Sequence, residues 1–267
     1  MKIALIAGSG NFPVYLAKEN PDTFVMCIEG HSDSKQFKNI TRTVSLLNPQ
    51  LWLKTLKENK VTHLVFAGKF NRPQNLDLSK DNNAYGMIRD ILSVGDNNAL
   101  LLIEKFFESN GFKILPINSV FKNCFIARGF YGDKFSLFNF KKYVLKSGNY
   151  GIDLLNTISK FDVGQSLVVS GNLIYAVEGL EGTNLLINRV KKLIINNNSV
   201  FGPALVKIPK IGQSRKMDLP VIGLDTIKEC IKTGISSVVI SSQGTIVIDQ
   251  EKIKSLISKA KICVLSV

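Results

Sequence analysis

The chain has 267 residues, enough for one large domain or two ordinary ones, and two domains is the expectation adopted here. With 45% hydrophobic and 21% charged residues, the composition is that of a folded globular protein and excludes a largely disordered chain. The formal net charge of +13 favours a polyanionic partner, which includes nucleic acid, an anionic membrane surface and a phosphorylated substrate, although a lysine-rich composition alone would give the same charge.

The N-terminal sequence MKIALIAGSG has a short apolar run that ends at glycines, and it is interpreted as a first strand and not as a signal peptide. No stretch approaches the roughly 20 apolar residues of a membrane-spanning helix. We therefore expect a soluble, cytoplasmic protein whose contact with lipid is peripheral. The cysteines show no metal-ligand spacing, and we expect them to be reduced and buried: Cys27, Cys124, Cys230 and Cys263.

In the first half of the chain, short β runs alternate with helical patterns. The expected strands are 2–7, 23–28, 62–67 and 113–116, and the expected helices are 13–18, 49–59 and 97–110. Strands that alternate with helices indicate a parallel sheet. We predict that residues 1–130 form an α/β, Rossmann-like nucleotide-binding domain.

The segment 118–140 is rich in aromatic residues, and the domain junction is placed here, so that residues 131–267 form a second domain. Two apolar runs, 165–169 and 173–177, are joined across Ser-Gly-Asn and predict a hairpin. Further helices are expected at 138–159, 183–195, 226–233 and 250–260, and further strands at 204–208, 237–241, 245–248 and 262–265. The second domain is therefore predicted to be α/β with mixed strand order.

Residues Gly8, Ser9 and Gly10 follow the first strand, and Asn11 leads into a helix. Glycines let the backbone approach a diphosphate, and a helix N-terminus offers unpaired amides to it. Glu29 follows the second strand at the distance where such folds place a carboxylate for a ribose hydroxyl. The G-x-G-x-x-G fingerprint of dinucleotide-binding domains is incomplete here, because Pro13 stands at its third glycine. A plain tight turn remains the alternative.

Lys69 and Arg72 come directly after the third predicted strand, at the edge where open α/β sheets bind ligands. Both cations could meet a phosphate, and a basic loop on a basic protein is the alternative. Asp96 lies in a Gly-Asp-Asn-Asn run that opens the next helix, where helix capping alone accounts for it.

In the second half, Glu178 and Glu181 flank a turn between a strand and a helix. Paired carboxylates suit magnesium, which takes one or two of them and leaves its other positions to water and phosphate, although solvated turn residues are the alternative. The segment 207–220 surrounds Asp218 with cations, among them Lys207, Arg215 and Lys216. Cations neutralise a diphosphate, and an aspartate holds a metal or orients water. The only histidines, His31 and His63, do not support a histidine-rich metal centre.

Together these blocks resemble the magnesium-dependent UDP-2,3-diacylglucosamine pyrophosphatases of lipid A synthesis, the family that differs from the calcineurin-like enzymes. The resemblance runs nearly end to end, and any one block is unspecific. It rests on Ile6–Gly10 with Pro13, Ala67–Lys69 with Arg72-Pro73, Gly95-Asp96, Phe161–Gln165, Ala176–Glu178 with Glu181–Thr183, and Asp218–Pro220 with Ile222-Gly223.

The resemblance implies hydrolysis of a nucleotide-activated glycolipid to UMP and 2,3-diacylglucosamine 1-phosphate, with Mg²⁺ as cofactor. It makes Asp218 the catalytic residue and a metal ligand beside Glu178 and Glu181. It also makes the polar residues of the second half substrate contacts: Gln165, Thr183, Lys207, Gln213, Arg215 and Lys216. Two departures stand out, because Asn184 and Ser214 occupy positions where the family usually has aspartate.

The acyl chains are placed along 121–140, for which buried core is the alternative. The expected partners are the glycolipid, transient contact with the cytoplasmic face of the inner membrane, and a second copy in a homodimer, with no nucleic acid. Two rival functions remain open at this point. The glycine turn and Glu29 suit an NAD-dependent oxidoreductase, and the charge suits a non-catalytic protein that binds anionic lipid or nucleic acid.

Overall fold

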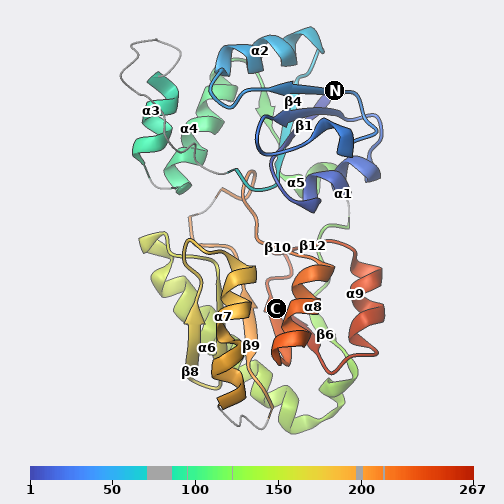
Figure 1. Cartoon of the computed structure of the whole chain (residues 1–267), viewed down its shortest axis with the longest axis vertical. Coiled ribbons are helices and arrows are strands. Elements are labelled where there is room, and N and C mark those ends of the chain that lie inside the picture. Colours follow the sequence, from blue (N-terminus) through green and yellow to red (C-terminus); the bar gives the residue numbers. More distant parts are fainter. Residues whose placement is uncertain (71–85, 95, 122, 197–200, 213) are drawn as a thin grey trace. The chain divides into compact units, whose positions relative to one another are not determined.

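The structure is a computed structural model, and it describes residues 1–70, 86–94, 96–121, 123–196, 201–212 and 214–267. The chain divides into two compact units (Figure 1). Unit 1 comprises Met1–Asn123 together with Ser214–Asp218, and unit 2 comprises Cys124–Gln213 and Leu219–Val267. The expected boundary at residue 130 differs from this division in one important respect, because a short segment from the second half of the sequence packs with the first unit.

Unit 1 is built on a parallel sheet of five strands in the order β3-β2-β1-β4-β5. The strands are β1 (Ile3–Ala7), β2 (Phe24–Ile28), β3 (Thr41–Val44), β4 (His63–Ala67) and β5 (Lys113–Ile114). The helices are α1 (Asn11–Glu19), α2 (Pro49–Glu58), α3 (Gly86–Ser93), α4 (Asp96–Ser109) and α5 (Ile117–Val120), with the 3₁₀ helix η1 (Ser34–Gln36). The parallel sheet expected for this half is confirmed.

Continuous apolar runs explain the central strands of unit 1, because a strand covered on both faces has no polar side. Residues 4–7 of β1 and all of β2 are buried. The core between sheet and helices includes several aromatic side chains, and Phe107 of α4 stacks on Trp52 of α2 at a centroid distance of 6.0 Å. Strand β3 was not expected from the sequence, because Thr41–Val44 lies at the sheet edge and shows little burial.

Unit 2 contains a mixed sheet of six strands in the order β6-β13-β11-β9-β7-β8, and a small parallel pair β10-β12. The strands are β6 (Gly129–Tyr131), β7 (Ser166–Ser170), β8 (Leu173–Val177), β9 (Ala204–Lys207), β10 (Val221–Ile222), β11 (Ser237–Ile240), β12 (Ile246–Val247) and β13 (Cys263–Ser266). The helices are η3 (Asp133–Ser136), α6 (Phe138–Ile158), η4 (Ser159–Phe161), α7 (Thr183–Asn196), α8 (Leu224–Thr233) and α9 (Gln250–Ile257). The mixed sheet and the β7-β8 hairpin are confirmed.

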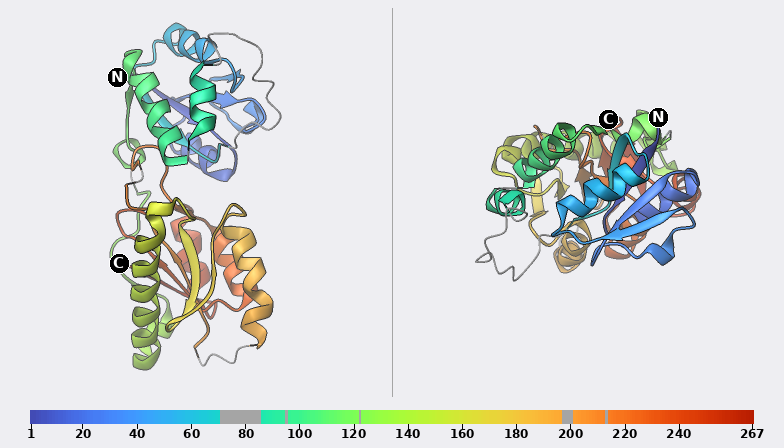
Figure 2. Two further views of the ribbon diagram at one scale, coloured as in Figure 1. Left: turned by 90° about the vertical axis from the view of Figure 1, so that its left-hand side faces the viewer. Right: turned by 90° about the horizontal axis from the view of Figure 1, so that it is seen from above.

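Helices cover both faces of the mixed sheet (Figure 2). Successive side chains of a strand point to opposite faces, so Val238 of β11 joins the core beneath α7, α8 and α9, while Val239 joins the core beneath α6. Helix α6 lies close to the sheet because Gly148 and Gly151 face it. A Cβ added at Gly151 would be 2.7 Å from Val206.

All four cysteines are buried and free of disulfides, as expected. Among the described helices, none combines the length and the apolar character needed to cross a membrane.

The loops that follow β1 and β4 are bound to each other at the carboxyl edge of the unit 1 sheet. The Ser9 amide donates to the Lys69 carbonyl at 2.9 Å, and the Lys69 amide donates to the Ser9 carbonyl at 3.0 Å. The Ser9 hydroxyl also donates to the Lys69 carbonyl, at 2.8 Å. This mutual pairing brings the two backbones so close that Gly8 and Gly68 have no room for a side chain. A Cβ at Gly68 would lie 2.7 Å from the Gly8 carbonyl carbon.

We predict that Gly68→Ala destabilises unit 1 by about 2 kcal/mol or more, because it forces a side chain against backbone at a φ of +93°. Gly86→Ala is the matched control, since a Cβ there meets nothing within 4 Å, and it should raise stability by up to about 1 kcal/mol. Urea unfolding followed by the fluorescence of Trp52, the only tryptophan and a residue of the unit 1 core, measures both. Equal midpoints for the two variants would contradict the close-packing argument.

Candidate functional site

The carboxyl edge of the unit 1 sheet gathers the expected nucleotide-binding residues. The strand order reverses between β1 and β4, the position at which open α/β sheets bind ligands. Helix α1 begins there at Asn11, and its N-cap is Gly10 with a φ of 98° and no atom within 4 Å of an added Cβ. Backbone amides at the start of α1 are therefore approachable by an anion. Gly8, in contrast, is explained by loop packing, since a Cβ there would meet the Lys69 carbonyl oxygen at 2.7 Å.

Glu29 and Lys69 are both exposed at this edge, directly after β2 and β4. The loop after β2 is held against β1, because the Ser32 hydroxyl donates to the Ala7 carbonyl at 2.7 Å. His31 belongs to this loop, and its ring lies 6.0 Å from that of Phe70. The described part of this edge thus presents the Glu29 carboxylate and the Lys69 ammonium group at the ends of neighbouring loops. Arg72, expected as the second cation, lies outside the described residues.

The segment 214–218 carries Asp218, and it is attached to α4 of unit 1. Lys216 Nζ donates to a carboxylate oxygen of Glu104 and, at 3.2 Å, to Glu108. The Ser214 hydroxyl contacts the other Glu104 oxygen at 3.4 Å. Met217 packs against the unit 1 core. These contacts explain why Asp218, expected in the second domain, belongs to unit 1.

Asp218 is half-buried at the end of a turn in which its amide donates to the Ser214 carbonyl at 3.2 Å. Of the two neighbouring cations, Arg215 is exposed, whereas Lys216 is occupied by the carboxylates of α4. The hydrogen bond from Lys216 to Glu104 raises the pKa of the lysine above its ordinary value. Arg215 is therefore the better candidate for a phosphate contact. Gln213, also expected in the site, lies outside the described residues.

Unit 2 has a buried polar cluster where β8 and β9 end. Glu178 is only 6% exposed. Its carboxylate accepts hydrogen bonds from the backbone amide of Gln165 at 3.0 Å and from the Thr183 hydroxyl at 2.8 Å. Lys207 is also buried, and its ammonium group donates to the same Thr183 hydroxyl at 2.8 Å. Thr183 therefore links a buried cation to a buried anion, which reduces the large cost of desolvating both charges.

Gly164 and Gln165 complete this cluster. Gly164 lies against Glu178 so closely that an added Cβ would be 2.5 Å from the Glu178 carbonyl oxygen. The side-chain oxygen of Gln165 is buried and has no hydrogen-bond partner within the described part of the chain. A buried acceptor without a partner calls for an explanation, and a hydrogen-bond donor from water or from a ligand would supply one. The cluster thus offers a place for a polar group.

Glu181 behaves differently from Glu178. It is held by Arg189 at 2.6 Å and by the Gly179 amide at 3.0 Å. The hydrogen bond from its own backbone amide, followed by the charge of Arg189, lowers the pKa of Glu181. Nearby, Lys210 pairs with Asp162 at 2.7 Å. Each of these carboxylates therefore has a cation of the protein beside it.

The expected magnesium ligands come from both units of the chain. Asp218 belongs to unit 1, whereas Glu178 and Glu181 belong to unit 2. Within the described ranges, no three His, Cys, Asp or Glu side chains gather in a metal-binding arrangement. Both oxygens of Glu178 are already used by Gln165 and Thr183. Asp218 stays the expected magnesium ligand in unit 1, where phosphate oxygens and water would complete the shell.

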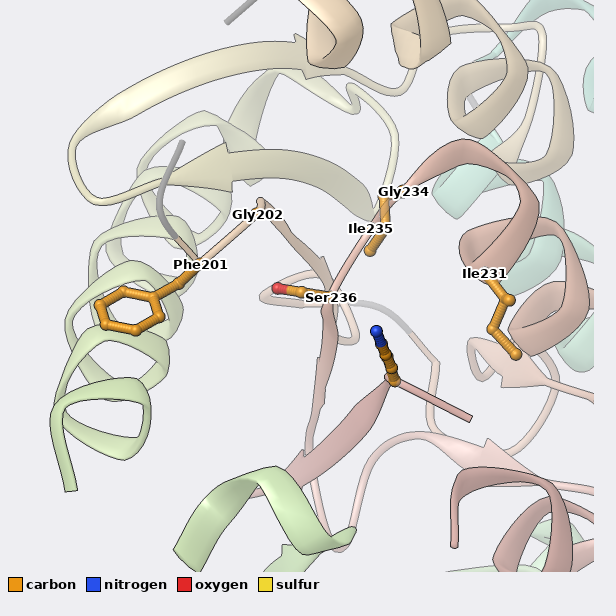
Figure 3. A pocket seen from close by; sticks show the side chains of 7 residues that line it. Phe201, Gly202, Ile231, Gly234, Ile235 and Ser236 are labelled. Atoms are coloured by element: carbon orange, nitrogen blue, oxygen red, sulfur yellow. The ribbon is translucent and has the colours of Figure 1, made fainter. Parts of the chain in front are cut away.

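A hollow of about 280 Å³ lies in unit 2 near the amino ends of β9 and β11, the opposite edge from the polar cluster (Figure 3). Its lining consists of Phe201, Gly202, Ile231, Gly234, Ile235, Ser236 and Lys261. None of the residues expected from the sequence to act in the site lines this hollow.

We predict that Glu104→Gln loosens the 214–218 segment, because it removes the charge that holds Lys216. Amide hydrogen exchange in a peptide covering 214–218 should become faster, with a loss of stability of about 1 kcal/mol or less, since Lys216 is partly exposed. Glu58→Gln is the control, because the Lys54–Glu58 pair is long and exposed. Unchanged exchange in Glu104→Gln would show that Met217 packing alone holds the segment.

The ion pair between Lys216 and Glu104 also makes the stability of the 214–218 segment depend on pH. The folded pKa of Lys216 is raised, so its contribution is complete below the unfolded lysine pKa of about 10.4 and disappears as pH rises through the folded value. Exchange in the 214–218 segment of the wild type should therefore approach that of Glu104→Gln only in strong alkali, after correction for the intrinsic rate.

We predict that Thr183→Val destabilises unit 2 by roughly 1–3 kcal/mol, because it leaves Glu178 and Lys207 buried without their link. Thr157→Val is the matched control, since that hydroxyl bonds only to the Asp153 carbonyl on the exposed side of α6. Calorimetric unfolding of both variants distinguishes them. A Thr183→Val midpoint within about 1 °C of the control would remove the linking role of this hydroxyl.

The comparison with known proteins also divides the chain near residue 124, although its second domain includes the 214–218 segment. Residues 2–124 match the model of the LpxI N-terminal domain, and residues 137–265 match the model of the LpxI C-terminal domain. A protein of Caulobacter vibrioides, named UDP-2,3-diacylglucosamine pyrophosphatase LpxI, is 27% identical over 265 residues, covering 94% of this chain and 92% of its own. With both domains present in order over nearly its whole length, the chain belongs to the LpxI family.

Proposed function

We propose that this chain hydrolyses the diphosphate of UDP-2,3-diacylglucosamine and releases UMP and 2,3-diacylglucosamine 1-phosphate for lipid A synthesis. The observation that carries the proposal is the match to both LpxI domains and, over 94% of the chain, to a relative named for this activity. The glycine turn, Glu29 and Lys69 support binding of the nucleotide at the carboxyl edge of unit 1. A glycolipid substrate and the lack of a spanning helix among the described residues are both compatible with transient membrane contact from the cytoplasm.

In the proposed reaction, a water oxygen bonds to one phosphorus as the bond from that phosphorus to the bridging oxygen breaks. Asp218 accepts the proton of the attacking water, and the two phosphate products leave. Arg215 and Lys69 neutralise phosphate charge during the reaction, as cations aimed at developing charge do. Magnesium held by Asp218 and by the substrate would withdraw negative charge from the phosphates.

The buried cluster of unit 2 has a supporting role in this proposal. Lys207, Thr183 and Glu178 fix the start of α7 relative to the ends of β8 and β9. The side-chain oxygen of Gln165 is then the acceptor available to a donor of the substrate, such as a sugar hydroxyl. Glu178 and Glu181 act in this account as structural carboxylates that keep the loop 178–182 in place.

We predict that Asp218→Ala lowers kcat by about 10²-fold or more, because positioned proton transfer contributes that much, while substrate binding is retained. Thin-layer separation of products from radiolabelled UDP-2,3-diacylglucosamine measures turnover, with magnesium and with EDTA. Asp153→Ala, which removes an exposed carboxylate of α6, is the control. A near-normal rate for Asp218→Ala would remove this residue from catalysis, and full activity in EDTA would remove magnesium from the proposal.

A further inference from the structure

The aromatic run 121–140, expected to contact lipid, divides into two sets in the structure. Phe121 and Phe140 are core residues, with exposures of 2% and 1%. Phe130 and Phe138 are exposed, and Leu137 is exposed beside them. The buried pair cannot contact lipid, whereas the exposed three form a patch at the start of α6, which we call the α6 patch.

The members of the α6 patch come from two elements that meet. Phe130 belongs to β6, the edge strand of the mixed sheet, and Leu137 and Phe138 begin α6. Lys141 joins the two elements, because its ammonium group lies 4.1 Å from the centroid of the Phe130 ring. Leu137 and Phe138 are 59% and 76% exposed, so large apolar side chains face water here.

Folding preferences do not explain these residues. Leu137 is the N-cap of α6 and makes no capping hydrogen bond, although Ser, Thr, Asp and Asn are the residues that stabilise this position. The first turn has no acidic residue, and Lys141 and Lys142 follow it. Cations at a helix N-terminus oppose the helix dipole. The start of α6 is thus apolar and basic at some cost to the helix itself, which points to a use outside the fold.

The charge of the patch selects the kind of partner. Arg128, Lys141 and Lys142 lie close to its members in the sequence, and Asp133 is the one acid among the described side chains of 128–142. Apolar side chains that project beside a cluster of cations are the features that bind proteins to anionic bilayers, since the cations attract the surface and the apolar groups enter it. A nucleic acid would use the cations and leave Leu137 and Phe138 unexplained.

We propose that the α6 patch docks this chain on an anionic bilayer, with Leu137 and Phe138 entering the interface and Lys141 and Lys142 facing the lipid phosphates. The idea that the membrane supplies the glycolipid substrate rests on the proposed function, but the docking itself requires no catalytic residue. The binding test below contains no substrate, so its failure is distinguishable from a failure of the proposed reaction.

Partition of the full chain into vesicles of phosphatidylcholine, with and without phosphatidylglycerol, tests the proposal by co-sedimentation. The wild type should prefer the anionic vesicles and lose binding as salt is raised. Leu137→Ser with Phe138→Ser should lower the partition coefficient by about tenfold or more. Lys141→Gln with Lys142→Gln should reduce the preference for anionic over neutral vesicles.

The matched control is Leu173→Ser with Ile195→Ser, which removes two apolar side chains of similar exposure, 56% and 68%, from elsewhere in unit 2. This control should change partition by less than twofold, and circular dichroism should show both double variants folded. Equal partition of Leu137→Ser/Phe138→Ser and the wild type would overturn the proposal. Size-exclusion chromatography gives a second result that would overturn it. The wild type would be a dimer, and Leu137→Ser/Phe138→Ser, but not the control, would be a monomer with unchanged vesicle binding. The patch would then contact a second copy of the chain.

Discussion

The attachment of Lys216 to Glu104 decides which part of the fold carries Asp218. Residues on both sides of the 214–218 segment belong to unit 2, yet the segment itself packs with unit 1. A turn of five residues has little structure of its own, so its position depends on the contacts that its side chains make. Lys216 and Met217 supply an ion pair and an apolar contact, and Asp218 follows them in the chain. The candidate catalytic residue is thus held in place by the contacts of its two neighbours.

The two units use polar residues in contrasting ways. In unit 1, the candidate groups are backbone amides and exposed side chains at the sheet edge, where parallel strands deliver loops to one place. In unit 2, Lys207 and Glu178 are buried and satisfied through Thr183. Buried charges linked in this way are costly to separate, so the loop 178–182 and the end of β9 are held as one body. Exposed groups can meet a ligand, whereas these buried ones determine where their neighbours lie.

Periodic patterns predicted the fold well, and contacts between distant residues could not be predicted in the same way. The continuous apolar runs of β1 and β2 and the hairpin β7-β8 were expected at nearly their observed bounds, because burial imposes those patterns locally. Strand β3 was missed because an edge strand needs few apolar residues. The role of Gly8 in packing and the occupation of Lys216 by Glu104 depend on partners remote in sequence. The hydrogen bonds of Glu178 to Gln165 and Thr183 depend on how two loops fold together, which no periodic pattern shows. A run of charges shows that cations are present and does not show which of them are already paired.

Ser214 illustrates how such a contact can account for a departure from a family pattern. The family resemblance led us to expect aspartate at this position, so a serine here implied that any metal shell would be filled differently. In the structure the Ser214 hydroxyl approaches Glu104 at 3.4 Å, and Glu104 also receives Lys216. An aspartate would bring a second carboxylate against Glu104, and like charges at that separation repel each other. Lys216 would then be shared between two anions, and the attachment of the segment would weaken. Serine at 214 therefore suits a segment that is anchored through Glu104.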